Sequence, residues 1–263
     1  MKLGFIGAGN MAQAMIGGVL GSGLLQKDDI IASAATQNTV EKVQKQYGIR
    51  TTLNNREAAG ADIVFLAVKP AYCGQVIGEI KDTVSEQQVV VSIAAGKTMA
   101  WLEEKFGGKR KIIRTMPNTP ALVGEGITAV CPNDNISAEE LQSVCKILES
   151  FGRAEVIQES MMDAVIAVSG SSPAYVFLFI EAMADAAVAE GMPRATAYQF
   201  AAQSVLGSAR MVLETGKHPG ELKDMVCSPA GTTIEAVRVL EREGLRGSVM
   251  ECMRACADKS RNM

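Results

Sequence analysis

The stretch Leu3-Gly4-Phe5-Ile6-Gly7-Ala8-Gly9-Asn10-Met11-Ala12 decides the fold of this chain. Its first four residues predict a short buried strand, and the residues from Asn10 to Leu20 predict a helix. The turn between them reads G-x-G-x-x-A, in which the first glycine permits a tight turn and the second lets a pyrophosphate approach the backbone. Small Ala12 allows close packing of helix on strand, and the helix N-terminus attracts phosphate. This context favours a dinucleotide site over a glycine-rich turn without a ligand.

Outward from this turn, the first half of the chain alternates apolar runs with helical patterns. Further strands are predicted at 30–32, 63–68, 89–93, 112–114 and 127–130, with a helix at 40–47. Strands that alternate with helices indicate βαβ units and a parallel sheet covered on both faces. We therefore predict an α/β, Rossmann-type parallel-sheet domain over residues 1–157.

The second half is predicted to be all-helical, over residues 158–263. From Glu159 onward the apolar residues follow a helical period, broken at 191–193 and 218–220. The run 174–188 is apolar on most sides, so it is either a central buried helix or one between subunits. Glu181 and Asp185 interrupt it as a membrane span, and we expect no membrane partner. So much apolar surface in a small bundle predicts oligomerisation.

Composition narrows the function classes. The net charge of -3 over 263 residues gives no footprint for nucleic acid. Six cysteines without framework spacing favour a reducing compartment, hence the cytoplasm. Cys252 and Cys256 have no nearby ligands to complete a metal site, and His218 is the sole histidine. The apolar run to Leu20 resembles a signal peptide, but its glycines fit the strand-turn-helix interpretation better.

The sequence indicates less clearly which dinucleotide the site binds. An NAD site usually places Asp or Glu at the end of the second strand, to hold the ribose hydroxyls. Here that segment reads Ser33-Ala34-Ala35-Thr36-Gln37-Asn38, with no carboxylate to repel a 2′-phosphate and no Arg to clamp one. The segment favours NADP(H) and leaves NAD(H) open.

Several segments, in order, resemble the pyrroline-5-carboxylate reductases. They are 4–12, Leu66-Ala67-Val68-Lys69-Pro70, Met116-Pro117-Asn118-Thr119-Pro120, Ser169-Gly170-Ser171-Ser172-Pro173-Ala174-Tyr175, His218-Pro219-Gly220-Glu221-Leu222-Lys223-Asp224 and Ser228-Pro229-Ala230-Gly231-Thr232-Thr233-Ile234. The resemblance runs nearly end to end. It implies a Rossmann domain, a helical dimerisation domain, a homodimer with a larger homo-oligomer left open, and an active site at the domain junction shared between subunits. It implies reduction of the C=N bond of 1-pyrroline-5-carboxylate to L-proline with NAD(P)H.

The motif and the resemblance together give the candidate cofactor-binding residues. Lys69 directly follows a buried strand, where α/β sheets place ligands, although a solvated loop lysine is the plainer alternative. The resemblance implies that Lys69, Pro70 and Asn55 line the cofactor cleft. The full set is Ile6, Gly7, Ala8, Gly9, Asn10, Met11, Ser33, Ala34, Asn55, Ala67, Val68, Lys69, Pro70, Ala94 and Ala95.

The segment Ser228 to Thr233 is the candidate substrate loop. It precedes an amphipathic helix, so its plainest role is a helix cap. A cap also presents free backbone N–H groups that can bind a carboxylate. We assign Ser228, Gly231, Thr232 and Thr233 to substrate binding, with Thr233 as the catalytic hydrogen-bond partner of the ring nitrogen. No strong catalytic acid is predicted, and His218 is expected to orient its own loop.

The chain departs from the family pattern in two places. The family usually has Gly at the position of Ala230, and many members carry a basic residue in the segment 34–39, which this chain lacks.

Two other functions are less consistent with the sequence. A β-hydroxyacid dehydrogenase needs a lysine early in its helical domain, whereas this chain has no Lys or Arg from Ala154 to Pro193. A cofactor-binding regulator without turnover would not need the 228–233 loop.

Overall fold

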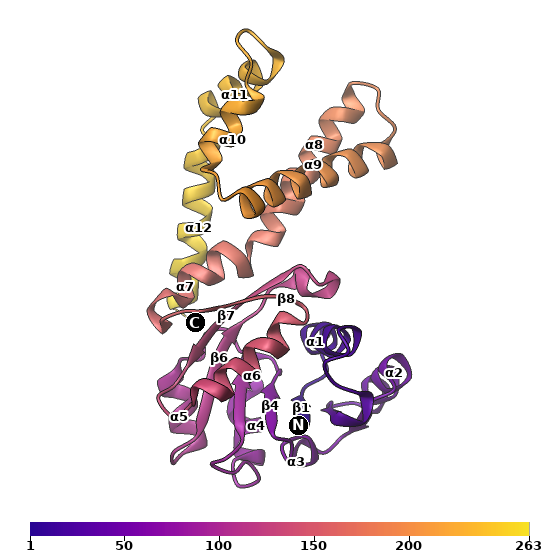
Figure 1. Ribbon diagram of the computed structural model, residues 1–263, viewed down its shortest axis with the longest axis vertical. Helices are drawn as coiled ribbons and strands as arrows, with labels where there is room; N and C mark the ends of the chain where they lie inside the picture. Colours follow the sequence, from indigo (N-terminus) through magenta and orange to yellow (C-terminus); the bar gives the residue numbers. More distant parts are fainter. Residues whose placement is uncertain (263) are drawn as a thin grey trace. The chain divides into compact units, whose positions relative to one another are not determined.

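The computed structural model describes residues 1–262, and its first compact unit is built on one eight-stranded sheet (Figure 1). The strands are β1 (Leu3–Ile6), β2 (Ile30–Ser33), β3 (Arg50–Thr52), β4 (Ile63–Leu66), β5 (Val89–Ser92), β6 (Lys111–Met116), β7 (Gly126–Pro132) and β8 (Gly152–Val156). Their order is β3-β2-β1-β4-β5-β6-β7-β8. Every neighbouring pair is parallel except β6 and β7.

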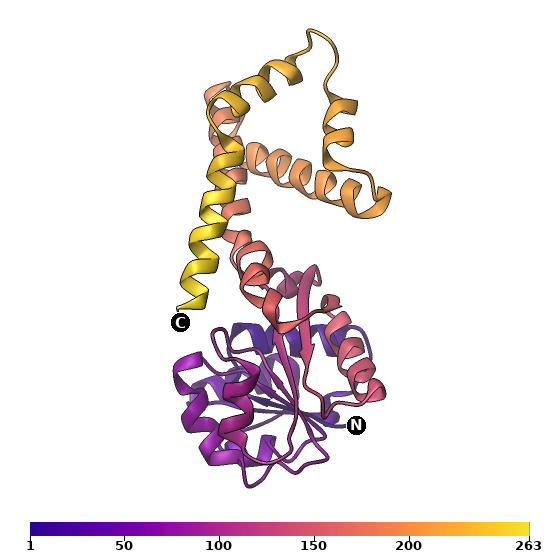
Figure 2. The same cartoon turned by 90° about the vertical axis from the view of Figure 1, so that its left-hand side faces the viewer.

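Helices cover both faces of the sheet. They are α1 (Asn10–Gly21), α2 (Gln37–Tyr47), α3 (Asn55–Ala58), α4 (Cys73–Ile80), α5 (Met99–Phe106) and α6 (Ala138–Glu149), with short 3-10 turns η1 (Lys27–Asp29), η2 (Pro70–Tyr72), η3 (Thr119–Val123) and η4 (Glu159–Met161). Buried side chains of α1, α2 and α6 form one core, and those of α3, α4 and α5 form another. Figure 2 shows α4 and α5 on one side of the sheet and α6 on the other.

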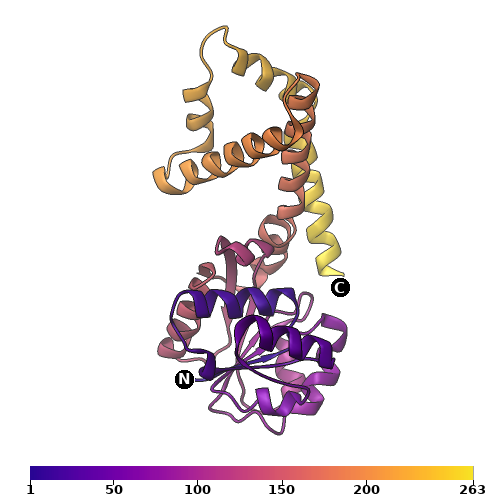
Figure 3. The same ribbon diagram turned by 90° about the vertical axis from the view of Figure 1, so that its right-hand side faces the viewer.

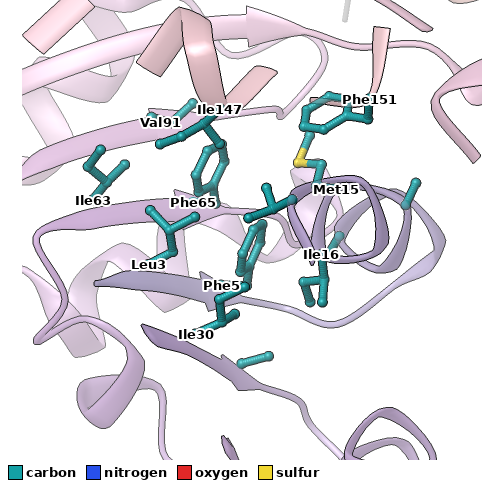
Figure 4. Close-up of a cluster of buried hydrophobic side chains, with 14 of the residues drawn as sticks. Leu3, Phe5, Met15, Ile16, Ile30, Ile63, Phe65, Val91, Ile147 and Phe151 are labelled. Carbon is teal, nitrogen blue, oxygen red and sulfur yellow. The ribbon is translucent and has the colours of Figure 1, made fainter. Parts of the chain in front are cut away.

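Central strands pack on both faces because their residues are apolar throughout. In the first core, Phe5 of β1 and Phe65 of β4 stack with ring centroids 4.8 Å apart. Met15 of α1 and Phe151, which precedes β8, close this core, and all four side chains are at most 1% exposed (Figure 4). This packing fixes β1 against β4, and therefore fixes the two turns that follow these strands.

The predicted strands are all present, and the predicted parallel sheet is confirmed, with one antiparallel pair, β6 with β7. The connection from Met116 to Gly126 is shorter than the roughly dozen residues that a parallel crossover needs, so β7 returns antiparallel to β6. Strands β3 and β8 were not predicted. Neither contains a buried residue, so they show no buried-strand pattern.

The rest of the chain is helical, as predicted from residue 158 onward. The helices are α7 (Met162–Val165), the π-helical η5 (Ile166–Gly170), α8 (Ser172–Ala189), α9 (Arg194–Thr215), α10 (Pro219–Val226), α11 (Thr232–Arg242) and α12 (Leu245–Arg261). Helices α8 and α9 pack against each other where the small residues Ala184, Ala197 and Ala201 are buried. Figure 3 shows α10 and α11 extending beyond this pair.

The chain forms two compact units, Met1–Ser171 with Cys256–Met263 and Ser172–Ala255. These units are defined by contacts in space and differ from the predicted domains 1–157 and 158–263. The domain boundary at 157/158 stays a prediction. One helical stretch among the described residues, Glu159–Ala189, is long and apolar enough to cross a membrane by length and composition alone. Only 6% of its most apolar 18 residues is buried, so most of this apolar surface is exposed in the single chain.

Candidate active site

Gly7 closes the turn that follows β1. Its φ of +94° lies in the region that costs an L-residue about 1–2 kcal/mol. A Cβ at this position would lie 2.6 Å from the Ala67 carbonyl oxygen and 2.9 Å from Cγ1 of Val68. The Gly7 N–H donates to the Ser33 carbonyl at 3.1 Å. Conformation and close approach to the end of β4 therefore both require glycine here.

Gly9 is different, because nothing in the protein occupies the space beside it. It is the N-cap of α1, no side chain caps that helix, and its first turn holds no acidic residue. A Cβ at Gly9 would meet no atom within 4 Å. Ala8 and Ala12 are buried, whereas Asn10 is exposed. The space beside Gly9 is therefore open, and the free N–H groups of the first turn are of the kind that bind phosphate groups.

The turns after β1 and β4 meet at the carboxyl edge of the sheet. β1 lies between β2 and β4, so the strand order reverses at this point, which is where open α/β sheets bind ligands. The Ala67 N–H donates to the Ile6 carbonyl at 2.8 Å. Ile6 is fully buried, so only its backbone can reach a ligand, whereas Lys69 is exposed. Pro70 begins η2 and directs the chain into α4.

The end of β2 is tied down by hydrogen bonds. The buried Ser33 hydroxyl donates to Oδ1 of Asn55 at 2.8 Å, and Nδ2 of Asn55 donates to the Glu79 carboxylate at 2.8 Å. Ala34 is 7% exposed, and its N–H donates to the Thr52 carbonyl at 3.1 Å. The side chains of Ser33 and Ala34 therefore face the protein, and the exposed side chains of residues 35–38 are the ones open to a ligand.

The segment after β5 lies beside the turn after β4. The Ile93 N–H donates to the Leu66 carbonyl at 3.3 Å, and Ala94 is 2% exposed. Ala95 is half-buried, and Gly96 follows it with a φ of +71°. The predicted cofactor residues thus gather at the carboxyl ends of β2, β1, β4 and β5, all within the first unit.

One thiol lies beneath this edge. Cys73 begins α4, and its Sγ lies 3.7 Å from the Lys69 carbonyl oxygen. Burial raises the pKa of the Cys73 thiol, and the positive charge of Lys97 offsets this only in part. Cys73 is therefore a protonated packing residue at neutral pH. No group of three or more His, Cys, Asp or Glu residues within 1–262 could hold a metal ion.

The predicted substrate residues come together in the second unit. Gly231 is the N-cap of α11, with φ −79° and ψ 169°, and no side chain caps this helix. Its N–H donates to the Ser228 carbonyl at 3.1 Å, which closes the loop, and a Cβ on Gly231 would collide with the Ser228 side chain. Thr232 and Thr233 are the first residues of α11. The free N–H groups there form a site suited to a carboxylate.

His218 has the local role that the sequence predicted. Its Nδ1 accepts a hydrogen bond from the Gly220 N–H at 3.0 Å and so caps α10.

The chain is similar to known proteins over its whole length. Residues 159–263 match the family model described as pyrroline-5-carboxylate reductase dimerisation, and residues 2–96 match that of coenzyme F420-dependent NADP oxidoreductases. The pyrroline-5-carboxylate reductase of Escherichia coli is 54% identical over 100% of this chain and 98% of its own length. The chain belongs to the pyrroline-5-carboxylate reductase family. Its relative from Methanosarcina acetivorans is 41% identical over 100% of this chain and 97% of its own.

Solved structures of the family have the same fold. The Plasmodium falciparum pyrroline carboxylate reductase, solved with NADP bound, superposes with a TM-score of 0.91 at 34% identity and covers 100% of this chain and 97% of its own. The Coxiella burnetii pyrroline-5-carboxylate reductase superposes with a TM-score of 0.91 at 35% identity and covers 98% of this chain and 96% of its own.

The departure from the family pattern at Ala230 has a conformational consequence. Ala230 has a φ of +56° and is the one non-glycine residue with positive φ in the described chain. Glycine adopts this conformation freely, whereas alanine is destabilised there by about 1–2 kcal/mol. The loop therefore keeps its shape in this chain under local strain.

Sequence reasoning missed the role of Asn118. The side chain is 8% exposed, donates to the Ser169 carbonyl at 3.1 Å and accepts from the Ile127 N–H at 2.9 Å. Asn118 and Ser169 both lie in segments that resemble the family, but they are 51 residues apart. The resemblance indicates both segments, but the hydrogen bond between them is evident only from the fold.

Proposed function

We propose that this chain reduces 1-pyrroline-5-carboxylate to L-proline with NADPH. The observation that carries the proposal is similarity at 54% identity over the whole length to a pyrroline-5-carboxylate reductase, with both predicted ligand-binding turns formed. The purified protein should form proline from pyrroline-5-carboxylate and consume one NADPH per proline. Stable NADPH with no proline formed would overturn the proposal.

The geometry of the carboxyl edge supports a role for each predicted cofactor residue. The free N–H groups of the first turn of α1 bind the pyrophosphate beside Gly9, and Gly7 lets the chain turn close to β4. Lys69 is exposed at the end of β4 and adds positive charge, while Asn55 holds the end of β2 in place. When bound, NADPH supplies the hydride. Bound NADPH would be held with its adenosine half by the residues after β2 and its nicotinamide half by the residues after β4 and β5, including Ala94 and Ala95.

The substrate needs one anion site and one hydrogen bond. The N–H groups at the start of α11 bind its carboxylate, so no Arg is required. The Thr233 hydroxyl bonds the ring nitrogen and orients the C=N bond. Because a threonine hydroxyl is a poor acid, the imine arrives already protonated, and hydride addition to its carbon leaves a neutral amine. The protein supplies orientation and electrostatics instead of a strong acid.

NADPH is the proposed preferred cofactor because the segment 35–38 is exposed and carries no carboxylate. We expect Ala35→Glu to weaken NADPH binding about tenfold or more and NADH binding no more than about twofold, since one like-charge contact is worth roughly 1 kcal/mol or more near a surface. Binding of both cofactors should be measured by titration at two salt concentrations, with Ala35→Gln as the uncharged control. Equal losses for both cofactors would place the 2′-phosphate elsewhere.

The helical unit is the proposed dimer interface, in a homodimer that works in the cytoplasm. The family model that matches residues 159–263 is one of dimerisation. Large apolar side chains stand exposed on α8 and α9: Val176, Phe177, Leu178, Phe179, Phe200, Leu206, Met211 and Leu213. A second copy of the chain, rather than a membrane, covers them, because Glu181 and Asp185 also lie on α8. Six free cysteines suit a reducing compartment.

Phe177→Glu should convert the dimer to monomers. Phe177 is 61% exposed in the single chain, and a charge buried at an interface without a partner costs several kcal/mol. Light scattering after size exclusion should give the monomer mass. Leu24→Glu, at an exposed apolar residue outside the helical unit, is the matched control and should stay dimeric. A Phe177→Glu variant that stays dimeric would place the interface elsewhere.

A further inference from the structure

The carboxylate of Glu159 joins three separate parts of the first unit. Glu159 begins η4, just beyond the last strand. Its Oε1 accepts from Nη1 of Arg114 on β6 at 2.6 Å and from the backbone N–H of Met99, the first residue of α5, at 2.7 Å. The Arg114 side chain is 6% exposed and that of Glu159 is 35% exposed. A buried guanidinium therefore fixes the carboxylate that holds the start of α5.

The segment that this contact holds is the one that follows β5. Other hydrogen bonds of residues 94–98 in the described chain are local: Ala94 to Ser92, and Thr98 to the first turn of α5. A cavity of about 340 Å³ adjoins it, lined in part by Gly96, Thr98, Arg114 and Glu159. Ala94 and Met99 are buried in the second core, but the cavity leaves Gly96 and Thr98 open on this side. The bond from Met99 to Glu159 is the hydrogen bond that ties this segment to a distant element.

We propose that Glu159, held by Arg114, is a positioning residue for the nicotinamide half of the cofactor. The inference rests on the proposed function. Ala94 and Ala95 lie four to five residues before Met99, at the carboxyl edge on the β5 side of β1. A dinucleotide bound at that edge would have its adenosine half at β2, so a shift of the 94–98 segment would act on the nicotinamide half.

Two variants separate positioning from general stability. Glu159→Leu with Arg114→Met removes the tether without leaving a buried unpaired charge, a replacement that is often neutral for stability. Glu159→Gln keeps an acceptor oxygen for the Met99 N–H but leaves Arg114 without its anion. Glu140→Gln is the matched control, because Glu140 pairs at 2.6 Å with Lys111, the first residue of the same strand, β6.

The experiment measures the affinity of each variant for NADPH and for adenosine 2′,5′-bisphosphate, which lacks the nicotinamide half, together with kcat and Tm. The double variant should bind NADPH about tenfold more weakly and turn over more slowly, with bisphosphate affinity within about twofold, since small misplacements of reacting groups cost large factors in rate. Glu159→Gln should keep NADPH affinity within about threefold despite a lower Tm, and Glu140→Gln should change neither affinity.

Unchanged NADPH affinity and kcat in the double variant, equal losses for both ligands, or losses that follow Tm across the variants would each overturn the positioning role. The wild-type protein separates this result from the proposed function. If wild-type binds and turns over NADPH while the double variant matches it, only the positioning role fails. If wild-type does not bind NADPH, the proposed function fails and the positioning role with it.

Discussion

Replacing Thr233 with valine should lower kcat about a hundredfold and leave NADPH affinity within about twofold of wild-type, since loss of one hydrogen bond to the reacting group typically costs that much. Valine has nearly the same shape as threonine and lacks only the hydroxyl, so α11 should still form. Its N-terminus needs no side chain from Thr233, because Gly231 is the N-cap and no side chain caps the helix. The backbone carboxylate site is therefore preserved, and the loss falls on the step at the ring nitrogen.

Thr215→Val is the matched control for this effect. Thr215 ends α9, and its hydroxyl donates to the Met211 carbonyl, outside the 228–233 loop. The control should keep wild-type kcat. Steady-state kinetics at saturating NADPH, with pyrroline-5-carboxylate varied, separates kcat from KM. Wild-type kcat in Thr233→Val would remove Thr233 from the reaction, and a raised KM alone would reduce its role to substrate binding.

Alanine at Gly7 and alanine at Gly9 should fail in different ways. Gly7→Ala places a Cβ 2.6 Å from the Ala67 carbonyl oxygen at a φ of +94°, so the free energy of unfolding should fall by about 2–5 kcal/mol from strain and overpacking together. Gly9→Ala meets no atom of the protein within 4 Å, and its φ of −73° suits alanine. It should fold normally but fill the space proposed for the pyrophosphate, which weakens NADPH binding roughly 5- to 150-fold for a clash of about 1–3 kcal/mol.

Denaturant unfolding and NADPH titration distinguish these two outcomes. Gly21→Ala, at the end of the same helix and also open to space, controls for the general effect of alanine in α1. Normal NADPH affinity in Gly9→Ala would place the pyrophosphate away from α1, and full stability in Gly7→Ala would contradict the tight approach to β4.

The sequence predicted what local composition controls. Strands β1, β4 and β5 are apolar and buried on both sides, so each could be located from its own residues. The glycine turn was also local, and the structure adds the positive φ of Gly7 and its close approach to Ala67. Edge strand β3 reads Arg50-Thr51-Thr52 and has no apolar signal, because one side of it faces solvent.

Contacts between distant residues could not be predicted. The bond between Ser33 and Asn55 spans 22 residues, and the ion pair between Arg114 and Glu159 spans 45. No periodicity links such residues, since their meeting depends on strand order and on the path of the connecting helices. Ala34 illustrates the consequence, because it was placed beside the cofactor by its position after β2, yet its side chain is buried and only its backbone can serve.

Hydride transfer from NADPH to the C=N carbon of pyrroline-5-carboxylate can be followed with an isotope label. The protein is incubated with NADPH deuterated at C4 of the nicotinamide, and the proline is analysed by mass spectrometry and NMR. We expect one deuterium at C5 of proline, the ring carbon that was double-bonded to nitrogen, when the face that donates is labelled. Proline without deuterium from either labelled face, or NADPH oxidation without proline, would contradict this transfer.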